Sequence, residues 1–399
     1  MKQENGIADL NKLYDAFRAS MKGSSWKPKS QQFESNWLCN LVLTSKKLEK
    51  RSYTAGEDES EFTINERGKT RHIHGSAIED RIVRHVLCDN ELQPKLAPYL
   101  IYNNGASRKG KGLAFSREMF ERDMHNFYLK YRTNEGYVGF VDFSKFYDNI
   151  RHDKIREIIY PKISKETHWL MDAILKHFEI DVSYMTDEEY ENYIERKFDS
   201  VVYYNNVPEE LRKAGRRYMP KSVDIGDQVS QDVGVFFPTR IDNYVKIVRG
   251  CKWYGRYMDD MYIICKDREE LKSIIAGIAV EAKELGLFIN EKKTRICKLS
   301  DTFKYLQIKY TLTDTGKLIK RINPKNVTRE RRRLKAYKHL INEGKMTYAD
   351  VEQAARSWMG EYSKLMSKLQ IKHMKSLYKE LFGKELTWKQ QLTLKTGKH

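Results

Sequence analysis

Residues 256–265 read RYMDDMYIIC, and this stretch decides which fold the chain is expected to have. Aromatic and aliphatic residues that favour β-strands stand on both sides of Asp259 and Asp260, which predicts a hairpin with Met258–Asp260 at its tip. Such a hairpin would hold two carboxylates side by side, where their charges repel. Aspartate is also a common turn residue, so the pair alone leaves two interpretations, a functional site and a solvated turn.

A third aspartate occurs in a matching setting. Asp142 ends GYVGFVD, residues 136–142, a run typical of a short buried strand. An aspartate at the end of one strand and a pair in the turn of another can share a cation, which removes the repulsion. Two Mg²⁺ ions about 3.5–4 Å apart would do so and would clamp the attacking and leaving oxygens of a phosphoryl transfer. Magnesium needs only a few carboxylates besides water and phosphates, so three aspartates are enough.

The charge of the chain points to a polyanionic partner. Lys and Arg number 73 against 55 Asp and Glu, a net charge of +18 over 399 residues. This excess favours a nucleic acid, with salt-dependent binding, over a merely soluble basic protein. The five cysteines show no metal-binding spacing, which suggests free thiols in a reducing compartment. The polar N-terminus and the lack of an apolar run of about 18 residues predict a cytoplasmic protein with no membrane partner.

Residue patterns outside the aspartate motifs predict mostly helices, with one further hairpin. Residues 61–75 alternate apolar and polar side chains around a glycine, which is typical of a hairpin. Residues 76–92 and 268–285 show helical periodicity, and residues 103–112 form a glycine-rich basic loop. From Pro324 onward the chain is helical and basic, and proline suits the first position of a helix.

Seven motifs occur in an order that is specific to one family. They are GKTRHIHGSAIEDRIVRHVL (68–87), ASRKGKG (106–112), FVDFSKFYDNI (140–150), IGDQVSQ (225–231), YMDD (257–260), GLFINEKKTRI (286–296) and FKYLQIKY (303–310). Together they resemble the reverse transcriptases of bacterial retroelements, a group that includes group II intron, retron, diversity-generating retroelement and phage-defence enzymes. The resemblance runs from about Glu61 to Leu312, with a thumb continuing to about Tyr378.

The resemblance implies an α+β fold, the right-hand polymerase with fingers, palm and thumb, in which the palm is an antiparallel sheet and the thumb is helical. We expect an N-terminal helical extension at 1–60, fingers at 61–135 and a palm at 136–312. The palm would carry an insertion at about 178–220, and 313–399 would form the thumb and C-terminal tail. The activity implied is that of an RNA-directed DNA polymerase, a nucleotidyltransferase.

The same resemblance gives the candidate catalytic residues, which are Asp142, Asp259, Asp260 and Lys293. Asp142 and Asp259 would bind two Mg²⁺ ions, for which Mn²⁺ is a substitute. Asp260 would assist, and the backbone carbonyl of Phe143 would be a further ligand. Lys293 would protonate the pyrophosphate leaving group, with the adjacent Lys292 as an alternative.

Two further sets of residues are expected to contact substrates. Lys69 and Arg71 would hold the triphosphate, unless they belong to an ordinary solvated hairpin. The other residues expected around the nucleotide are Phe143, Tyr147, Ile225 and Gly226. The residues expected on nucleic acid are Arg108, Lys109, Lys111, Gln231, Arg332 and Arg333. The alternative for Arg108 is a plain anion-binding loop. The alternative for the thumb arginines is a solvated helix face.

Tyr147 bears on the choice of sugar. It stands five residues after Asp142, where reverse transcriptases keep a bulky aromatic under the sugar, and a ring there would clash with a ribose 2′-hydroxyl. Viral RNA-copying polymerases usually have glycine before the paired aspartates, whereas this chain has Met258. DNA synthesis is therefore expected. The alternative is that Tyr147 is simply a core aromatic.

The chain departs from the family pattern at three places. Ile225 replaces a common glutamine that braces the incoming nucleotide, which leads to the hypothesis of reduced fidelity. Gln307 replaces a usual glycine in the segment that positions the primer. The interval from Asp142 to Asp259 is longer than in compact relatives, and the insertion within it would contact a partner or a structured RNA, or would be a neutral surface elaboration.

The overall interpretation is a reverse transcriptase of a bacterial or phage retroelement or defence system. Expected partners are an RNA template, in particular a dedicated noncoding or repeat RNA, a DNA primer or cDNA product, deoxynucleotides, and an accessory protein. Two alternatives stand beside it: template-independent or protein-primed DNA synthesis in defence, and a non-catalytic RNA-binding scaffold. The scaffold would have no reason to keep mutually repelling acids.

Overall fold

One antiparallel sheet carries both aspartate motifs. The computed structural model describes residues 6–57, 59–66 and 69–388. Within them, this sheet has the strand order β6 (Tyr254–Tyr257), β7 (Asp260–Cys265), β3 (Tyr137–Val141) and β8 (Arg295–Lys298). Tyr257 pairs with Asp260, so the β6–β7 turn consists of Met258 and Asp259. The turn is one residue shorter than expected because Asp260 is already part of the ladder.

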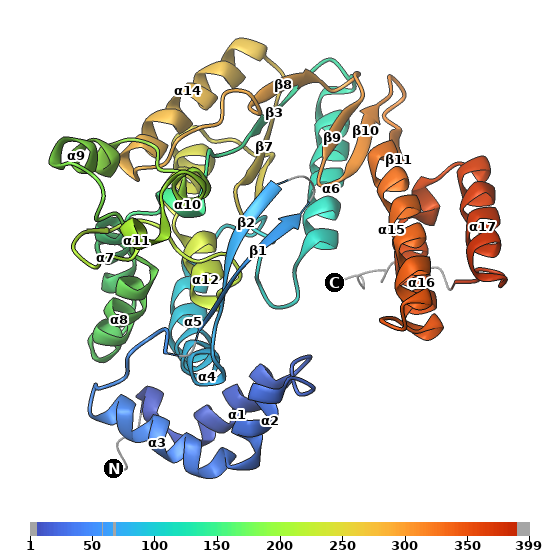
Figure 1. Ribbon diagram of the computed structural model, residues 1–399. Coiled ribbons are helices and arrows are strands. Elements are labelled where there is room, and N and C mark those ends of the chain that lie inside the picture. The colour runs from blue at the N-terminus through green and yellow to red at the C-terminus, as the bar shows by residue number, and fades with distance from the viewer. Residues whose placement is uncertain (1–5, 58, 67–68, 389–399) are drawn as a thin grey trace. The chain divides into compact units, whose positions relative to one another are not determined.

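Helix α14 (Arg268–Glu284) covers one face of this sheet (Figure 1). The contact is close because β3 presents a glycine: a Cβ at Gly139 would lie 3.0 Å from Leu271 and 3.2 Å from Ile275. In β7, the five residues after Asp260 are all buried, as expected for a strand enclosed on both faces. Phe120 packs edge-on against Tyr262 of β7, with ring centroids 4.9 Å apart.

The N-terminal helices α1 (Leu10–Met21), α2 (Pro28–Ser35) and α3 (Trp37–Glu49) lie together near α4 (Ile78–Leu87) (Figure 1). Polar contacts fix α4 to them. Thr44 Oγ1 donates to Glu79 at 2.8 Å, Lys47 pairs with Glu79 at 2.9 Å, and Arg81 donates to Ser24 at 3.1 Å. The expected hairpin is formed by β1 (Ser60–Glu66) and β2 (Lys69–Gly75), which pair antiparallel from Ser60 opposite Gly75 to Glu66 opposite Lys69.

The insertion forms a small body with its own stem and core. Its stem is the antiparallel pair β4 (Ile180–Asp181) and β5 (Tyr218–Met219). Between them lie the helices α9 (Asp187–Glu195), α10 (Ser200–Asn206) and α11 (Glu209–Arg212). Its buried apolar side chains are Ile180, Val182, Met185, Phe198, Tyr203 and Met219. This separate core explains how such a long segment can fold between β3 and β6.

The chain divides into two units by internal contacts. One contains the residues up to Phe120 and Val138–Ile296, and the other contains Glu121–Tyr137 and the residues from Cys297 onward. The second unit has a three-stranded sheet in the order β11 (Leu318–Ile322), β10 (Ile308–Leu312) and β9 (Phe303–Tyr305). Its helices α15 (Pro324–Asn342), α16 (Tyr348–Tyr362) and α17 (Lys368–Phe382) share a core that includes Leu334, Val351, Met359 and Tyr378. Pro324 is the first residue of α15, as predicted.

The remaining elements connect these parts. They are η1 (Gly6–Ala8), η2 (Cys88–Leu92), α5 (Gln93–Leu96), η3 (Ala97–Tyr99), α6 (Leu113–Tyr131), η4 (Tyr147–Asn149), α7 (His152–Ile159), η5 (Tyr160–Lys162), η6 (Lys165–Thr167), α8 (His168–Phe178), α12 (Gln228–Phe236), α13 (Thr239–Asn243), η7 (Tyr244–Val248) and η8 (Ser363–Leu365). Helices mixed with antiparallel strands confirm the α+β class. Among the described residues, no helix has both the length and the apolar character needed to cross a bilayer. The fingers, palm and thumb boundaries stay a prediction.

Candidate active site

Asp142 directly follows β3, and the segment before β8 fixes its backbone. The Asn290 amide donates to the Asp142 carbonyl at 2.8 Å, and the Ser144 amide donates to the Phe288 carbonyl at 2.7 Å. These bonds enclose the antiparallel bridge between Phe143 and Ile289. In such a bridge the enclosed residue points its own carbonyl away from its partner. The carbonyl of Phe143 therefore faces the side of β3 on which β7 lies.

The same segment brings a lysine to Asp142. The amide of Lys293 donates to the carbonyl of Asn290 at 3.0 Å, and Lys293 Nζ lies 2.6 Å from Asp142 Oδ1. The side chain of Lys293 is 47% exposed and that of Asp142 is 14% exposed. Because one partner is so exposed, this ion pair is expected to add little stability. Lys292 is exposed as well, but in the ion pairs of the described residues Lys293 is the lysine that reaches Asp142.

The turn that carries Asp259 is held from inside the protein. Met258 has a φ of +57°, a left-handed conformation that costs a residue with a side chain about 1–2 kcal/mol. Arg256, fully buried, donates from Nη1 to the Met258 carbonyl at 3.0 Å and from Nη2 to the Val235 carbonyl at 2.8 Å. Its charge is balanced by Asp242, also fully buried, at 2.7 Å. The turn is thus anchored to α12 and α13 through one arginine.

The three aspartates do not form a closed cluster. Among the described residues, the set of three ligating side chains whose ligand atoms all lie within 4.8 Å is a different one, consisting of Glu59, His177 and Asp224. Carboxylates packed so closely would repel one another. The carboxylate of Asp142 is instead paired with Lys293. Asp259 is half-buried and Asp260 exposed. Carboxylates together with a backbone carbonyl on the β7 side are the oxygen donors that Mg²⁺ prefers, so the residues present fit this ion.

Tyr147 is half-buried in η4, and a glycine brings it to the aspartate hairpin. A Cβ built on Gly234 of α12 would lie 3.1 Å from Met258 Sδ, 3.4 Å from Tyr147 Cε1 and 3.4 Å from Phe146 Cε1. Phe146 in turn stacks on Phe143 with ring centroids 5.6 Å apart. Tyr147 and Met258, which the sequence analysis connected to sugar choice, therefore both contact one helical glycine.

Ile225 and Gly226 lie in the loop before α12. Ile225 is half-buried, and Gly226 is exposed with a φ of +101°, where a side chain would be strained. The next residue, Asp227, caps α12 by accepting from the amides of Val229 and Ser230. It also pairs at 2.5 Å with the buried Arg84 of α4. This loop is therefore held on one side by a helix cap and on the other by an ion pair.

The basic loop folds back on itself and on the edge of the sheet. The amide of Gly105 donates to the Arg256 carbonyl, and Arg108 donates at 3.1 Å to the carbonyls of Ile101 and Asn104. Lys111 lies over the rings of Tyr102 and Phe115, and burial lowers its pKa to about 8. Of these three cations in the described structure, Lys109 is exposed, whereas Arg108 and Lys111 are half-buried.

The structure describes the side chain of Gln231 but not those of Lys69 and Arg71. Gln231 of α12 accepts from Ser107 Oγ at 2.8 Å, so the basic loop and α12 are joined. Lys69 and Arg71 lie on β2, but their side chains fall outside the described part of the structure. Their role at the triphosphate stays a prediction.

Arg332 and Arg333 lie on α15 in the second unit. Arg332 is exposed, whereas Arg333 pairs with the buried Glu330 at 2.8 Å and lies over the ring of Tyr337. Adjacent arginines thus have different surroundings: Arg333 is held by an ion pair, although its side chain is still 41% exposed.

Sequence reasoning missed three residues that support this site: Arg256, Asp242 and Gly234. An arginine inside an otherwise apolar strand was the signal for Arg256, because such a charge needs a buried partner. The partner itself, Asp242, lies fourteen residues earlier in helix α13 and has no local signal. Gly234 had none either, since a glycine within a helix indicates close packing without naming the neighbour.

Residues 64–310 match the family model described as reverse transcriptase (RNA-dependent DNA polymerase). No curated protein matches the chain in a sequence comparison. The matched segment contains β3, the β6–β7 hairpin and the Lys293 segment, and it implies the right-hand polymerase fold expected from the motifs. Because the match covers more than half of the 399 residues, the chain belongs to the reverse transcriptase family and is an RNA-directed DNA polymerase.

Proposed function

We propose that Asp142, Asp259 and Asp260, with Lys293, are the catalytic residues of this polymerase, and that two Mg²⁺ ions serve it, with Mn²⁺ as a substitute. Reverse transcriptases bind an RNA template, a primer and deoxynucleotides, and generally use divalent metal ions. The observation that carries the residue assignment is the position of Lys293 Nζ, 2.6 Å from Asp142 Oδ1 at the end of β3. A mobile ammonium beside a carboxylate suits a site where phosphates enter and leave.

The aspartates and the Phe143 carbonyl would hold the metal ions, which supply charge stabilisation for the attacking and leaving oxygens. Lys293 would hold its proton at Nζ and donate it to the leaving pyrophosphate oxygen as the bond between that oxygen and phosphorus breaks, a role in which a positioned acid contributes about 10²–10⁴-fold in rate. Tyr147 would lie beneath the deoxyribose and exclude a 2′-hydroxyl. Arg256 would keep Asp259 in place by holding the carbonyl that precedes it.

The biological setting that we propose is a bacterial or phage retroelement or a phage-defence system copying a dedicated noncoding or repeat RNA into cDNA. The support is the ordered set of motifs together with Ile225, which stands where a hydrogen-bonding glutamine is common. Loss of that hydrogen bond would lower fidelity. An Ile225→Gln variant with an unchanged misincorporation spectrum would refute the link between this residue and fidelity.

Extension of a primed RNA template by the purified chain in Mg²⁺ tests the assignment. We expect cDNA from deoxynucleotides, none from ribonucleotides, and no product from the Asp259→Ala/Asp260→Ala variant. Asp301→Asn, which changes an exposed aspartate of the second unit, should leave extension at the wild-type level.

Two neighbouring lysines give a matched pair for the proton donor. Lys293→Gln should lower kcat by about 10²–10⁴-fold, while Lys292→Gln should stay near wild type. Equal losses in both variants would contradict the role given to Lys293. Polymer formed from deoxynucleotides without any RNA would contradict templated copying as the reaction of this site.

A further inference from the structure

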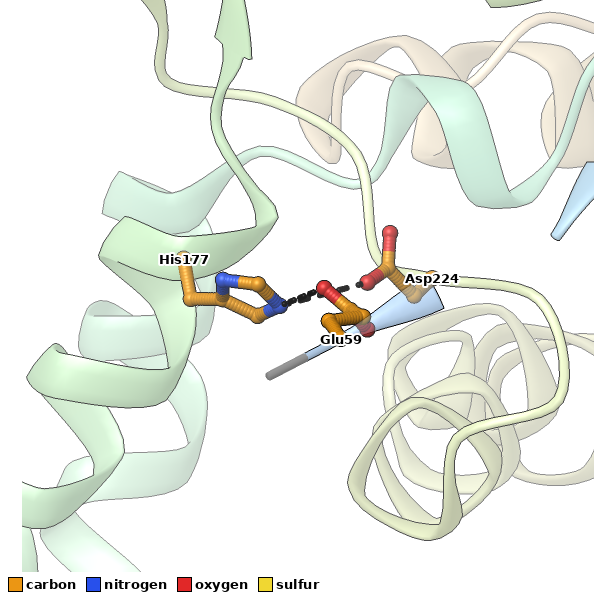
Figure 2. A group of neighbouring side chains, drawn as sticks. All are labelled: Glu59, His177 and Asp224. Carbon is orange, nitrogen blue, oxygen red and sulfur yellow. Dashed lines mark ion pairs between the residues drawn. The ribbon is translucent and has the colours of Figure 1, made fainter. Parts of the chain in front are cut away.

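Three side chains from distant parts of the chain converge on one point away from the aspartates. Figure 2 shows Glu59, His177 and Asp224 with the imidazole and the two carboxylates directed toward one another. His177 Nε2 lies 2.9 Å from Glu59 Oε2 and 4.0 Å from Asp224 Oδ2. The ligand atoms of all three lie within 4.8 Å of one another. Both carboxylates thus approach the same ring nitrogen.

Each residue belongs to a different element of the first unit. Glu59 directly precedes β1, His177 lies in the last turn of α8, and Asp224 precedes Ile225 in the loop before α12. Their side chains are 9%, 16% and 13% exposed, so the group lies mostly below the surface. Carboxylates buried to this extent are costly unless a cation is close to them.

The surroundings orient the histidine and favour a cation. Gly56 has a φ of +88°, and a Cβ there would lie 2.2 Å from His177 Cε1, so the backbone passes directly against the ring. A cavity of about 50 Å³ adjoins the group and is lined by Asp148, Glu179 and Asp224 among others. This volume holds an ion with a water molecule or two, and its acidic lining attracts positive charge.

The ligand distances and chemistry select the kind of ion. Zn²⁺ binds nitrogen and oxygen ligands at about 2.0–2.2 Å, which places two ligand atoms of a tetrahedron about 3.3–3.6 Å apart. The separations of 2.9 and 4.0 Å between the imidazole and the two carboxylates bracket this value, so shifts of about half an ångström would bring each of these two pairs to the tetrahedral spacing. An imidazole ligand suits Zn²⁺, whereas Mg²⁺ prefers oxygen ligands only. The group would therefore discriminate against the Mg²⁺ that serves polymerisation.

We propose that Glu59, His177 and Asp224 form a binding site for a divalent transition-metal ion, with Zn²⁺ as the best match. The site is structural: it ties the start of the β1–β2 hairpin and the end of α8 to the loop that contains Ile225 and Gly226. A metal ion bound to the folded state alone raises stability with its concentration. This inference does not depend on the roles proposed for Asp142, Asp259 and Asp260.

Zinc binding by the full-length chain tests this proposal. Protein stripped with a chelator is dialysed into buffer with millimolar Mg²⁺, and Zn²⁺ is titrated by calorimetry and by thermal unfolding. We expect one equivalent of Zn²⁺ to bind and Tm to rise by several degrees. His177→Gln and Asp224→Asn should each lose that equivalent and the rise in Tm. His373→Gln, an exposed histidine on α17, is the matched control and should behave as wild type.

The outcomes separate the metal site from its alternatives. The Asp259→Ala/Asp260→Ala variant should keep the bound equivalent, which distinguishes this site from the aspartates of β3 and the β6–β7 hairpin. If the wild type binds no Zn²⁺, the three side chains form only an internal histidine–carboxylate ion pair and the proposal is wrong. It is equally wrong if His177→Gln and Asp224→Asn both bind as the wild type does, because the ion then sits elsewhere.

Discussion

Two turns contain residues whose backbone conformations glycine adopts more easily. Met258 has a φ of +57° in the β6–β7 turn, and Gln307, where the family usually has glycine, has a φ of +73° in the β9–β10 turn. Leu306 beside Gln307 also has a positive φ, as the two-residue turn of that hairpin requires. The turn in the segment predicted to position the primer is therefore formed without the usual glycine. At Met258 the strain of about 1–2 kcal/mol is smaller than the roughly 2–5 kcal/mol that removal of a buried methionine costs, so packing decides this residue.

Gly234→Ala tests how tightly this packing positions Tyr147. The new Cβ would stand 3.1 Å from Met258 Sδ and 3.4 Å from Tyr147 Cε1, so one of them must shift by a few tenths of an ångström. We expect the unfolding free energy to fall by about 1–3 kcal/mol. We also expect kcat/KM for deoxynucleotides to fall by about tenfold, because misplacement of about 1 Å costs about 10²-fold.

Steady-state kinetics with deoxynucleotides and ribonucleotides, beside a urea unfolding curve, measures both effects. Tyr147→Ala serves as a comparison, since it removes the ring and should raise ribonucleotide use. Normal kinetics in Gly234→Ala, with only the stability changed, would show that the glycine is needed for folding and not for positioning.

Strand β6 connects the stability of the sheet to the placement of the turn that carries Asp259, a proposed catalytic residue. The carboxylate of Asp242 neutralises the charge of Arg256, and Tyr254 Oη donates a hydrogen bond to the same carboxylate at 2.6 Å. Burial of both charges is expensive, and loss of one partner leaves the other uncompensated. One strand thus carries a buried charge whose guanidinium also holds the backbone of the turn.

Asp242→Ala should lower the unfolding free energy by about 3–5 kcal/mol, because the guanidinium of Arg256 would remain buried without its partner. Arg256→Met/Asp242→Leu removes both charges and should recover most of that stability. The double variant should nevertheless extend primers poorly, since nothing would hold the carbonyl of Met258. Denaturant unfolding and primer extension on the same samples measure this, and full activity in the double variant would contradict the anchoring role.

Helix α15 presents exposed basic residues three positions apart, Arg329, Arg332 and Lys335. Residues at this spacing share a helix face. Arg and Lys on one face suit the phosphates of a nucleic-acid duplex. Arg333 differs from them in its ion pair with the buried Glu330, which engages its guanidinium although the side chain is 41% exposed.

Arg332→Gln should weaken binding of an RNA–DNA hybrid and reduce the slope of log Kd against log salt by about 1, as expected when one phosphate contact is lost. Arg333→Gln, the adjacent control, should change the slope less and reduce the unfolding free energy more, because it leaves the buried carboxylate of Glu330 without its ion-pair partner. Fluorescence anisotropy at several salt concentrations measures the slopes. The same slope change in both variants would contradict the idea that the ion pair with Glu330 keeps Arg333 from binding phosphates.

In the first unit as a whole, the insertion braces the segment that follows Asp142. Asn149, fully buried, accepts from the amide of Phe198 at 2.8 Å and donates to its carbonyl at 3.1 Å. Asp148 accepts from the amide of Ser200, and burial raises the pKa of Asp148 to about 6. Lys145 pairs with Asp199 at 2.8 Å. Three consecutive insertion residues therefore bind the motif that carries Asp142 and Tyr147.

Asn149→Ala should cost about 2–4 kcal/mol of unfolding free energy, since it leaves the buried amide and carbonyl of Phe198 unsatisfied. It should also lower polymerase activity, because the insertion would no longer hold η4. Asn206→Ala, at an exposed position of α10, is the control and should stay within about 0.5 kcal/mol of wild type. Thermal unfolding and primer extension provide the measurements. If Asn149→Ala matched that control, the insertion would be the neutral elaboration that the sequence left open.

The sequence by itself determined the α+β class, the hairpin around Asp259, the helices flanking it and the family. These features follow from strand alternation and helical periodicity, which are local preferences of a few residues, and from the order of the motifs along the chain. It also gave the candidate set of Asp142, Asp259, Asp260 and the two lysines at 292 and 293. Roles at the nucleotide stay predictions.

Only the tertiary structure decided which lysine reaches Asp142, which acid neutralises Arg256, what Gly234 contacts and what the insertion holds. The residues that meet come from different parts of the chain in each case. Glu59, for example, lies more than a hundred residues before both His177 and Asp224. Such contacts depend on how elements pack, and no local preference encodes them. A pattern in the sequence can say that a buried charge or a close-packed glycine needs a neighbour, and the packed chain alone supplies that neighbour.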